Sequence, residues 1–329
     1  MKLYTISLLL LFLVPPGFAQ VVASNAVADK SSVSTAPIAL AMVLEKQVQE
    51  VNLVLSVTDR RGHFVRGLLP GDLTILDNNK QQTAITFFES QTDLPLHIAV
   101  VLDISSSVAY RFVQEQETMR AFLHEVAKPH DSVELIAFNQ GVRLVAPING
   151  NWKPLSKRVK RMKPGGETAL YDAVTAASRR LAQDARPARR IIILVSDGQE
   201  NHSTATSDST IAEVLKDEAV LYAVNIGDDH FSEAGKQGDQ VLQQLSDATG
   251  GSYLQAGPNG AVDSAFGKIR RELRSQYALA YKPSNLAGQL FHQLKVVAGN
   301  LRVRCRTGYY AKQASVKEAT VSGIDALNR

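Results

Sequence analysis

The sequence has one cysteine, few aromatic residues and no hydrophobic run long enough to cross a membrane. Cys305 cannot form a disulfide within the chain, so packing must stabilise the core of this 329-residue protein. Aromatic residues make up 6%, and the Lys and Arg residues behind the net charge of +4 are spread along the chain. That composition argues against a nucleic-acid-binding surface. We therefore expect a globular protein with no nucleic-acid partner.

The N-terminus has the pattern of a secretory signal peptide. Lys2 precedes an apolar run from Ile6 to Val14, which is shorter than the ~20 residues of a spanning helix. Small residues then precede the expected cleavage site after Ala19. We expect residues 1–19 to be removed, with no transmembrane segment in the mature chain. Export would take the protein to a periplasm or out of the cell, and residues 20–46, rich in Ala, Ser and Val, would form a tether.

The central part of the chain has the pattern of a parallel sheet. Its apolar runs are continuous instead of alternating, which is typical of strands buried on both faces. Segments with helical spacing lie between them, so we predict a doubly wound α/β fold over residues 93–257. The predicted strands are Ile98–Leu102, Val133–Phe138, Ile191–Val195 and Val220–Val224. The predicted helices have apolar faces at Phe112 to Val126, Leu170 to Leu181 and Ile211 to Leu215.

One strand at the edge of this sheet is expected to run antiparallel. Val142 to Ile148 follows the turn Asn139-Gln140-Gly141 so closely that the two flanking strands should form a hairpin. A mostly parallel sheet with one antiparallel edge strand results.

The two flanks of the α/β region have β-type sequences. Residues 47–92 alternate between strand and turn signals, with strands expected at 51–58, 63–65, 73–76 and 83–88. Residues 258–312 contain a helix-like stretch ending near Ser275 and strands around 277–281, 290–297 and 301–310. Neither half is large enough to be stable alone, so we predict that they pack into one small β-module. We expect residues 313–329 to form a C-terminal tail.

Cys305 lies in the alternating segment Arg302-Val303-Arg304-Cys305-Arg306. The alternation places Cys305 and Val303 on one face of a strand and the arginines on the other. The pattern favours a buried small hydrophobic residue over a reactive thiol.

Five oxygen-bearing side chains follow the predicted strands or precede a predicted helix. Asp103, Ser105 and Ser107 follow one strand, Asp197 follows another, and Thr168 precedes a helix. Because ligands of parallel α/β sheets bind outside the carboxyl ends of the strands, we expect these side chains to converge. Each alone has an ordinary explanation as a turn or cap residue.

Such a set of oxygens suits a hard dication. Mg²⁺ prefers oxygen ligands, with Mn²⁺ or Ca²⁺ as alternatives, whereas the scarcity of thiolates and imidazoles in these loops argues against zinc. Hydroxyl ligands are neutral, so three hydroxyls and two carboxylates would leave the metal open to one further anionic oxygen. That position could accept a carboxylate from a protein partner.

These residues also match a known pattern. Asp103-x-Ser105-x-Ser107, Thr168 in Gly-Gly-Glu-Thr-Ala-Leu and Asp197 in Ser-Asp-Gly resemble the metal-ion-dependent adhesion site of von Willebrand factor type A domains. The resemblance covers about residues 94–257. It implies that Ser105 and Ser107 bind the metal directly, that Thr168 binds directly or through water, and that both aspartates act largely through water or hydrogen bonds.

The wider layout resembles exported bacterial proteins that carry such domains. It rests on Asp59-x-x-Gly62, the stretch from Arg271 to Tyr281 and the ending Arg306-Thr307-Gly308-Tyr309-Tyr310. That group implies little about the identity of the ligand. We expect no enzymatic activity, and the resemblance to von Willebrand factor type A domains implies an adhesion-type binding module. It also implies a C-terminal helix, beyond Gly260, that shifts when ligand binds.

Two other functions compete with this interpretation. A structural or assembly factor of the envelope would use the β-module for its interactions. A Mg²⁺-dependent phosphotransferase or hydrolase would need a second aspartate two residues after Asp103 for proton transfer, and Ser105 stands there. No phosphate-binding loop or nucleophile elbow is found in the sequence.

Overall fold

The computed structural model describes nine segments of the chain. They are residues 50–90, 94–110, 112, 130–148, 158–159, 161–227, 230–256, 261–284 and 290–311. The predicted signal peptide, tether and tail lie outside them. So does most of the helix expected from Phe112 to Val126, of which Phe112 itself is described and buried.

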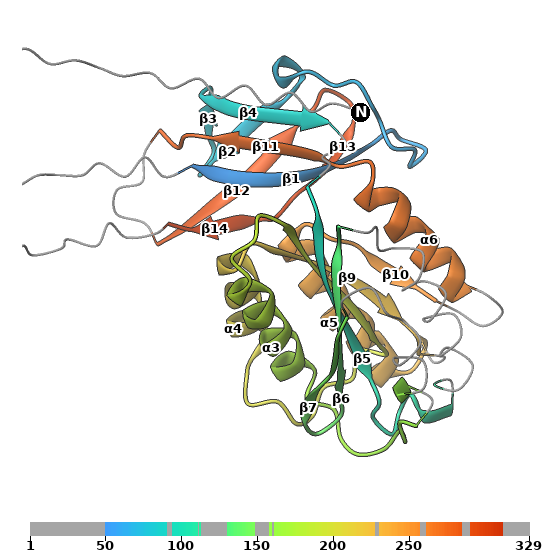
Figure 1. The fold of residues 1–329 in the computed structure, drawn as a ribbon. Helices are drawn as coiled ribbons and strands as arrows, with labels where there is room; N and C mark the ends of the chain where they lie inside the picture. The colour runs from blue at the N-terminus through green and yellow to red at the C-terminus, as the bar shows by residue number, and fades with distance from the viewer. Residues whose placement is uncertain are drawn as a thin grey trace, which may run out of the picture. The chain divides into compact units, whose positions relative to one another are not determined.

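A six-stranded sheet forms the centre of the α/β region (Figure 1). Its strand order is β10-β9-β8-β5-β6-β7, and every pairing is parallel except that of β6 with β7. The predicted mostly parallel sheet with one antiparallel edge is thus confirmed. The bounds are β5 (Leu96–Asp103), β6 (Ser132–Phe138), β7 (Val142–Ile148), β8 (Arg189–Ser196), β9 (Ala219–Asn225) and β10 (Tyr253–Gln255).

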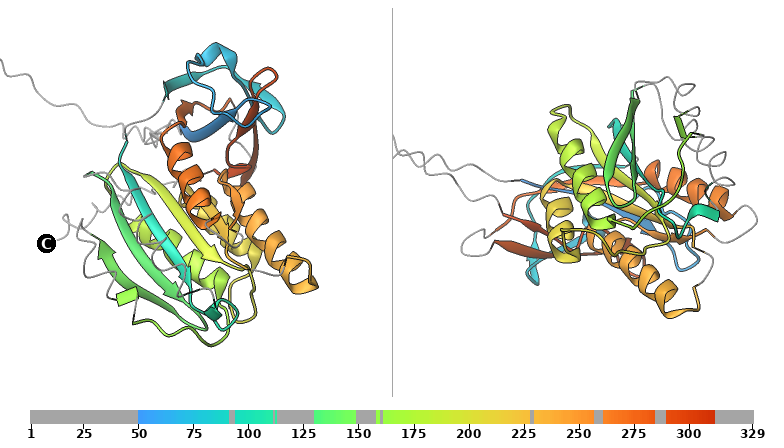
Figure 2. Two further views of the ribbon diagram at one scale, coloured as in Figure 1. Left: turned by 90° about the vertical axis from the view of Figure 1, so that its right-hand side faces the viewer. Right: turned by 90° about the horizontal axis from the view of Figure 1, so that it is seen from below.

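Both faces of this sheet are buried, which explains the continuous apolar runs. On β5, Val100 packs into a core on one face and Val101 into a core on the other. Helices α3 (Leu170–Gln183), α4 (Ser207–Lys216) and α5 (Glu233–Thr249) contribute to the second core, and α6 (Ala261–Leu273) to the first (Figure 2). Helices on both faces are what a doubly wound sheet requires.

Helix α5 is a 17-residue element that the sequence analysis does not predict. It begins after Ser232, whose side chain accepts a hydrogen bond from the Gly235 amide, and ends at Gly250 in the left-handed region. Its buried apolar residues are few, with Leu242 and Leu245 in the core. Ser232 and Gly250, its two cap residues, are the features of the sequence that could have predicted this helix.

The flanking strands form two four-stranded antiparallel sheets with a shared core, which we call the β-sandwich. The predicted combination of both flanks is found, although as two sheets. Leu55, Ile75, Tyr281 and Val296 pack in one core cluster. One sheet contains β13 (Arg302–Arg304), β1 (Val51–Thr58), β11 (Tyr277–Tyr281) and β4 (Ile85–Ser90); the other contains β14 (Gly308–Tyr310), β12 (Phe291–Val297), β2 (Thr74–Asp77) and β3 (Lys80–Gln82).

Two predicted strands differ from the structure. Residues 63–65 form one isolated bridge, between Phe64 and Thr58, and no regular strand. Residues 301–310 divide into β13 and β14, which pair with strands of different sheets. The connecting Thr307 donates its amide to Ala248 at the end of α5, which draws the chain away from the first sheet.

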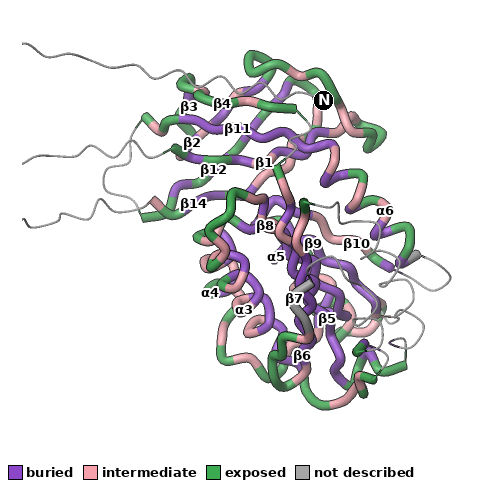
Figure 3. Tube along the Cα trace, in the orientation of Figure 1, coloured by how far each residue is buried: buried purple, intermediate pink, exposed green. Residues whose placement is uncertain are grey.

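A buried polar network joins α6 to the sheet and the β-sandwich. Glu272 on α6 accepts hydrogen bonds from Ser56 Oγ (2.8 Å) on β1 and from the Tyr222 hydroxyl (3.0 Å) on β9. Gln276 donates to the same Tyr222 hydroxyl (2.9 Å) and accepts from Arg189 Nη1 (2.7 Å). All five residues are buried, so these hydrogen bonds are shielded from water. Figure 3 shows buried residues in purple along the strands of the central sheet.

Cys305 is half-buried against the core of the β-sandwich, and burial raises the pKa of its thiol to about 11. We predict that the native protein reacts slowly with iodoacetamide at pH 8, because its thiolate fraction there is about a hundredfold smaller than that of an ordinary thiol. Mass spectrometry of alkylated protein measures this rate. Urea-unfolded protein is the control and should react at the ordinary rate. Equal rates in both states would contradict the assigned burial.

Candidate metal centre

Three loops meet at the carboxyl edge of the six-stranded sheet. The loop after β5 is joined to the loop before α3 by backbone hydrogen bonds from Ser106 to Gly166 (3.0 Å) and from Gly165 to Ile104 (2.8 Å). The loop after β8 joins the same region, because the Asn201 amide donates to the Thr168 carbonyl (3.1 Å). The three loops that carry the predicted site residues are therefore in contact with one another.

Asp103 is fully buried at the end of β5. Its carboxylate accepts hydrogen bonds from the Ser105 amide (2.8 Å) and from Ser196 Oγ (2.6 Å). Burial raises the pKa of Asp103 to about 6, and the nearby carboxylate of Asp197 adds to the effect. A carboxylate in this position would be stabilised by a neighbouring cation.

Ser105 and Ser107 have the spacing of adjacent metal ligands. Their Oγ atoms are 3.1 Å apart and share a hydrogen bond. Two oxygens that bind one Mg²⁺ at right angles, each at ~2.1 Å, would be about 3.0 Å apart. Ser105 is buried and Ser107 is exposed, so the pair reaches from the interior to the surface of the sheet edge. This geometry fits a shared ion without a large rearrangement.

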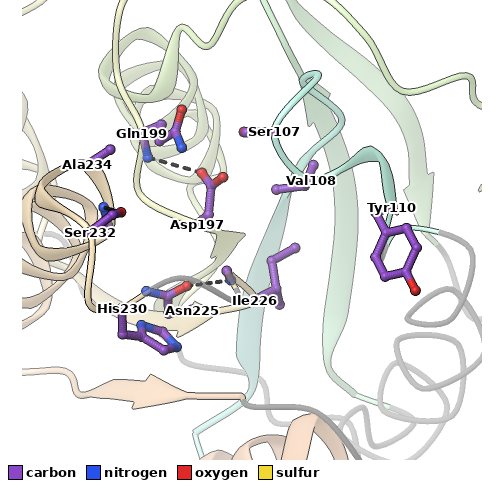
Figure 4. A pocket seen from close by; sticks show the side chains of 12 residues that line it. Ser107, Val108, Tyr110, Asp197, Gln199, Asn225, Ile226, His230, Ser232 and Ala234 are labelled. Carbon is purple, nitrogen blue, oxygen red and sulfur yellow. Dashed lines mark hydrogen bonds between the residues drawn. The ribbon is translucent and has the colours of Figure 1, made fainter.

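Thr168 and Asp197 lie on the other two loops. Both are buried, and the Thr168 amide is held by Asn201 Oδ1 (2.8 Å) while Asp197 Oδ1 accepts the Gln199 amide (3.1 Å). Asp197 and Ser107 line one pocket, which places the ends of β8 and β5 around a common space (Figure 4). No hydrogen bond joins Thr168 to the serine pair, so its place in the site rests on the loop contacts.

The donor set is one of hydroxyls and carboxylates. In the described part of the chain, no three His, Cys, Asp or Glu side chains gather as a metal-binding cluster. His202, the imidazole in these loops, pairs with Glu167 (Nδ1 to Oε2, 2.5 Å) beside Thr168. Hydroxyl and carboxylate oxygens of this kind are typical ligands of hard divalent cations such as Mg²⁺.

Some residues that shape the centre were not predicted. Ser196 donates to Asp103, Asn201 holds Thr168, and Asn139 Nδ2 donates to the Gly165 carbonyl (2.8 Å). Ser196 and Asn139 stand at or just beyond the ends of β8 and β6, so the strand-edge rule could have found them. Asn201 lies five residues beyond the end of β8, so the strand-edge rule does not identify it.

Gly198 and Gly238 allow the Asp197 loop to approach α5 closely. A Cβ atom at Gly238 would lie 2.3 Å from the Asp197 carbonyl oxygen. We predict that Gly238→Ala pushes the loop away, which should weaken Mn²⁺ binding about tenfold and lower the melting temperature by roughly 4 °C. Calorimetric titration and thermal unfolding measure the two effects.

Gly267→Ala in α6 is the matched control. A Cβ there would come no closer than 3.5 Å to another atom, the Arg271 Nη1, so Mn²⁺ affinity should be unchanged. Wild-type Mn²⁺ affinity in Gly238→Ala would show that this contact does not position the centre.

A pocket of about 300 Å³ adjoins the centre. Besides Ser107 and Asp197, its walls include Val108, Ile226 and His230, from the loops after β5 and β9. The pocket therefore lies beside Ser107 and Asp197 at the edge of the sheet.

Comparison with known proteins gives a family match for part of the chain. Residues 98–199 match the model of the von Willebrand factor type A domain. The search of curated proteins finds no significant match. In the described residues, no helix is long and apolar enough to span a bilayer.

Several solved structures are similar. An aerotolerance-related membrane protein from Bacteroides fragilis is 17% identical, with a TM-score of 0.45, over 54% of this chain and 98% of its own. A von Willebrand factor type A protein from Catenulispora acidiphila is 14% identical, with a TM-score of 0.48, over 72% of each chain. The pilus adhesin SpaC from Lactobacillus rhamnosus GG is 12% identical, with a TM-score of 0.44, over 76% of this chain and 49% of its own.

Proposed function

Because residues 98–199 match the von Willebrand factor type A domain, we propose that this chain is an exported protein-binding module whose binding depends on a metal ion. Its centre would bind Mg²⁺ and capture an acidic group of a protein partner. Mn²⁺ or Ca²⁺ would be alternative ions. The protein would be located in a periplasm or outside the cell.

The observation that carries the proposal is the 3.1 Å separation of Ser105 Oγ and Ser107 Oγ beside a buried carboxylate. These hydroxyls would hold the ion together with Asp103, Thr168 and Asp197. A bound Mg²⁺ supplies positive charge to which an anionic oxygen can bind. The exposed side of the centre, at Ser107, leaves room for that oxygen to come from another protein.

We propose no catalytic role for the centre. Domains of this family are typically non-catalytic. The position two residues after Asp103 is Ser105, whose hydroxyl cannot perform the proton transfer of a Mg²⁺-dependent phosphotransferase near neutral pH.

Affinity purification from the native envelope tests the function. Immobilised mature protein should retain a partner in Mg²⁺ and release it in chelator, and Thr168→Val, which removes a buried hydroxyl at constant shape, should retain about tenfold less. Thr83→Val, an exposed site between β3 and β4, is the matched control and should behave as wild type.

The competing function predicts a different pattern. If the module were a structural or assembly factor acting through its β-sandwich, the same proteins would be retained in chelator and by Thr168→Val. That result would overturn the metal-dependent proposal.

A further inference from the structure

The segment that follows β1 carries three exposed arginines at a tight turn. Arg60 and Arg61 occupy the turn, and Arg66 stands just beyond it. Asp59, which precedes them, pairs with His63 at 3.2 Å. None of the three arginines forms an ion pair with a residue that the structure describes. Their positive charges are therefore available to a partner.

A fourth arginine lies on the neighbouring strand. Arg302 of β13 is exposed and stands opposite Thr58, the last residue of β1. Phe64 forms an isolated bridge with the same Thr58, which holds the two arms of the turn together. Arg302 and the turn arginines therefore belong to the same end of β1, where positive charge is concentrated.

An apolar side chain projects from the same segment. Leu69 is 67% exposed, more than any other leucine that the structure describes, whereas its neighbour Leu68 packs against the core of the β-sandwich. The Tyr277 hydroxyl accepts the Leu68 amide (3.2 Å) and donates to the Val65 carbonyl (3.0 Å), which fixes the segment. Leu69 is therefore held in an exposed position by its anchored neighbours.

Several backbone amides of the segment are bonded within the protein. Asp59 Oδ1 accepts the amides of Arg61 (2.8 Å) and His63 (2.9 Å). Asp72 Oδ2 accepts the amide of Leu69 (2.8 Å). An amide that leaves water without a partner is costly, so a segment whose amides are already bonded can enter a non-aqueous interface at lower cost. These bonds also offset part of the negative charge of the two aspartates.

We propose that this segment binds a membrane surface rich in anionic phospholipids, with the arginines at the phosphate groups and Leu69 inserted among the acyl chains. A turn that projects from the end of a strand is convex, so it fits a flat surface better than a peptide. Interfacial binding combines basic side chains that attract anionic headgroups with an apolar side chain that inserts. The surface uses no residue of the metal centre and does not depend on the function proposed above.

Cosedimentation with phospholipid vesicles tests the proposal. The mature chain, kept in chelator so that no divalent ion links it to lipid, should bind vesicles of phosphatidylglycerol mixed with phosphatidylcholine. It should not bind vesicles of phosphatidylcholine alone. Arg60→Gln, Arg61→Gln and Arg66→Gln should each weaken binding about fivefold, and Leu69→Ser about tenfold. All four side chains are exposed, so the variants should keep the wild-type melting temperature.

Two variants at other exposed sites are the matched controls. Lys236→Gln removes a positive charge from α5. Leu290→Ser replaces a leucine of similar exposure (63%) next to β12. Both should bind the mixed vesicles as tightly as the wild type.

Three results would overturn the proposal. They are no binding to the mixed vesicles, equal binding to both kinds of vesicle, and wild-type binding by all the arginine variants. Binding to soluble polyglutamate without binding to vesicles would also overturn it and would assign the arginines to an acidic protein segment. Each of these results would leave the metal-dependent function standing.

Discussion

Ser105→Ala should lose Mg²⁺ and Mn²⁺ binding by about 100-fold or more in calorimetric titration. Ser105 is buried, its Oγ lies 3.1 Å from Ser107 Oγ, and its amide donates to Asp103. Alanine keeps that amide and removes the proposed ligand oxygen. The loop should therefore keep its conformation while the ion loses one direct ligand.

Ser203→Ala provides the matched control for this loss. Ser203 lies in the loop after β8. Its hydroxyl donates to Glu200 and accepts the Asp172 amide, and neither residue is a proposed ligand. Metal affinity should stay at the wild-type value in this variant, and circular dichroism should show native helix content in both proteins. Unchanged Mn²⁺ affinity in Ser105→Ala would mean that the serine pair is not the metal site.

Asp77→Leu should lower the free energy of unfolding by about 3–5 kcal/mol, because it removes the acceptor of a buried polar cluster. One carboxylate oxygen of Asp77 accepts the hydroxyls of Tyr281 and Tyr309, each at 2.8 Å. The other lies 2.9 Å from His292 Nδ1. All four side chains are buried in the β-sandwich, so their loss of a partner cannot be compensated by water.

Smaller changes to the same cluster calibrate the effect. Tyr281→Phe and Tyr309→Phe each remove one donor and leave the carboxylate paired with the others, so each should cost about 1 kcal/mol. Urea unfolding followed by circular dichroism measures all three variants. If Asp77→Leu lowered the free energy of unfolding by less than either tyrosine variant does, the cluster would not stabilise the β-sandwich.

The α/β region could be predicted because its signals are local. Burial of both faces of β5 and β8 requires continuous apolar runs, and these runs are visible in the sequence. Helix α5 has weaker signals, since Gly235 and Gly238 are poor helix formers and few of its residues are apolar. Gly238 is explained by its contact with Asp197, which no local pattern shows.

The β-sandwich was predicted only in part, because its pairings are not local. Strand β1 pairs with β11, more than 200 residues away, and β2 pairs with β12 at a similar separation. Alternation predicts that a segment is a strand but not which sheet it joins. Residues 301–310 therefore read as one strand, although β13 and β14 belong to different sheets.

The five site residues stay a prediction, although four of them lie where the strand-edge rule looks for ligands. Asp103, Ser105, Ser107 and Asp197 stand at or just beyond the ends of β5 and β8. The pocket was missed, although Asn225 ends β9 at the same edge and satisfied that rule. Its other walls depend on how the loops after β5 and β9 approach each other, and sequence spacing does not give that distance.

The most direct test of the metal centre is the anomalous diffraction of crystals soaked in Mn²⁺. The structure predicts a peak at the carboxyl edge of the six-stranded sheet, about 2.1 Å from both Ser105 Oγ and Ser107 Oγ. The peak should be absent from crystals of Ser105→Ala treated in the same way. A wild-type crystal with no peak between these serines, or with Mn²⁺ bound elsewhere, would contradict the account.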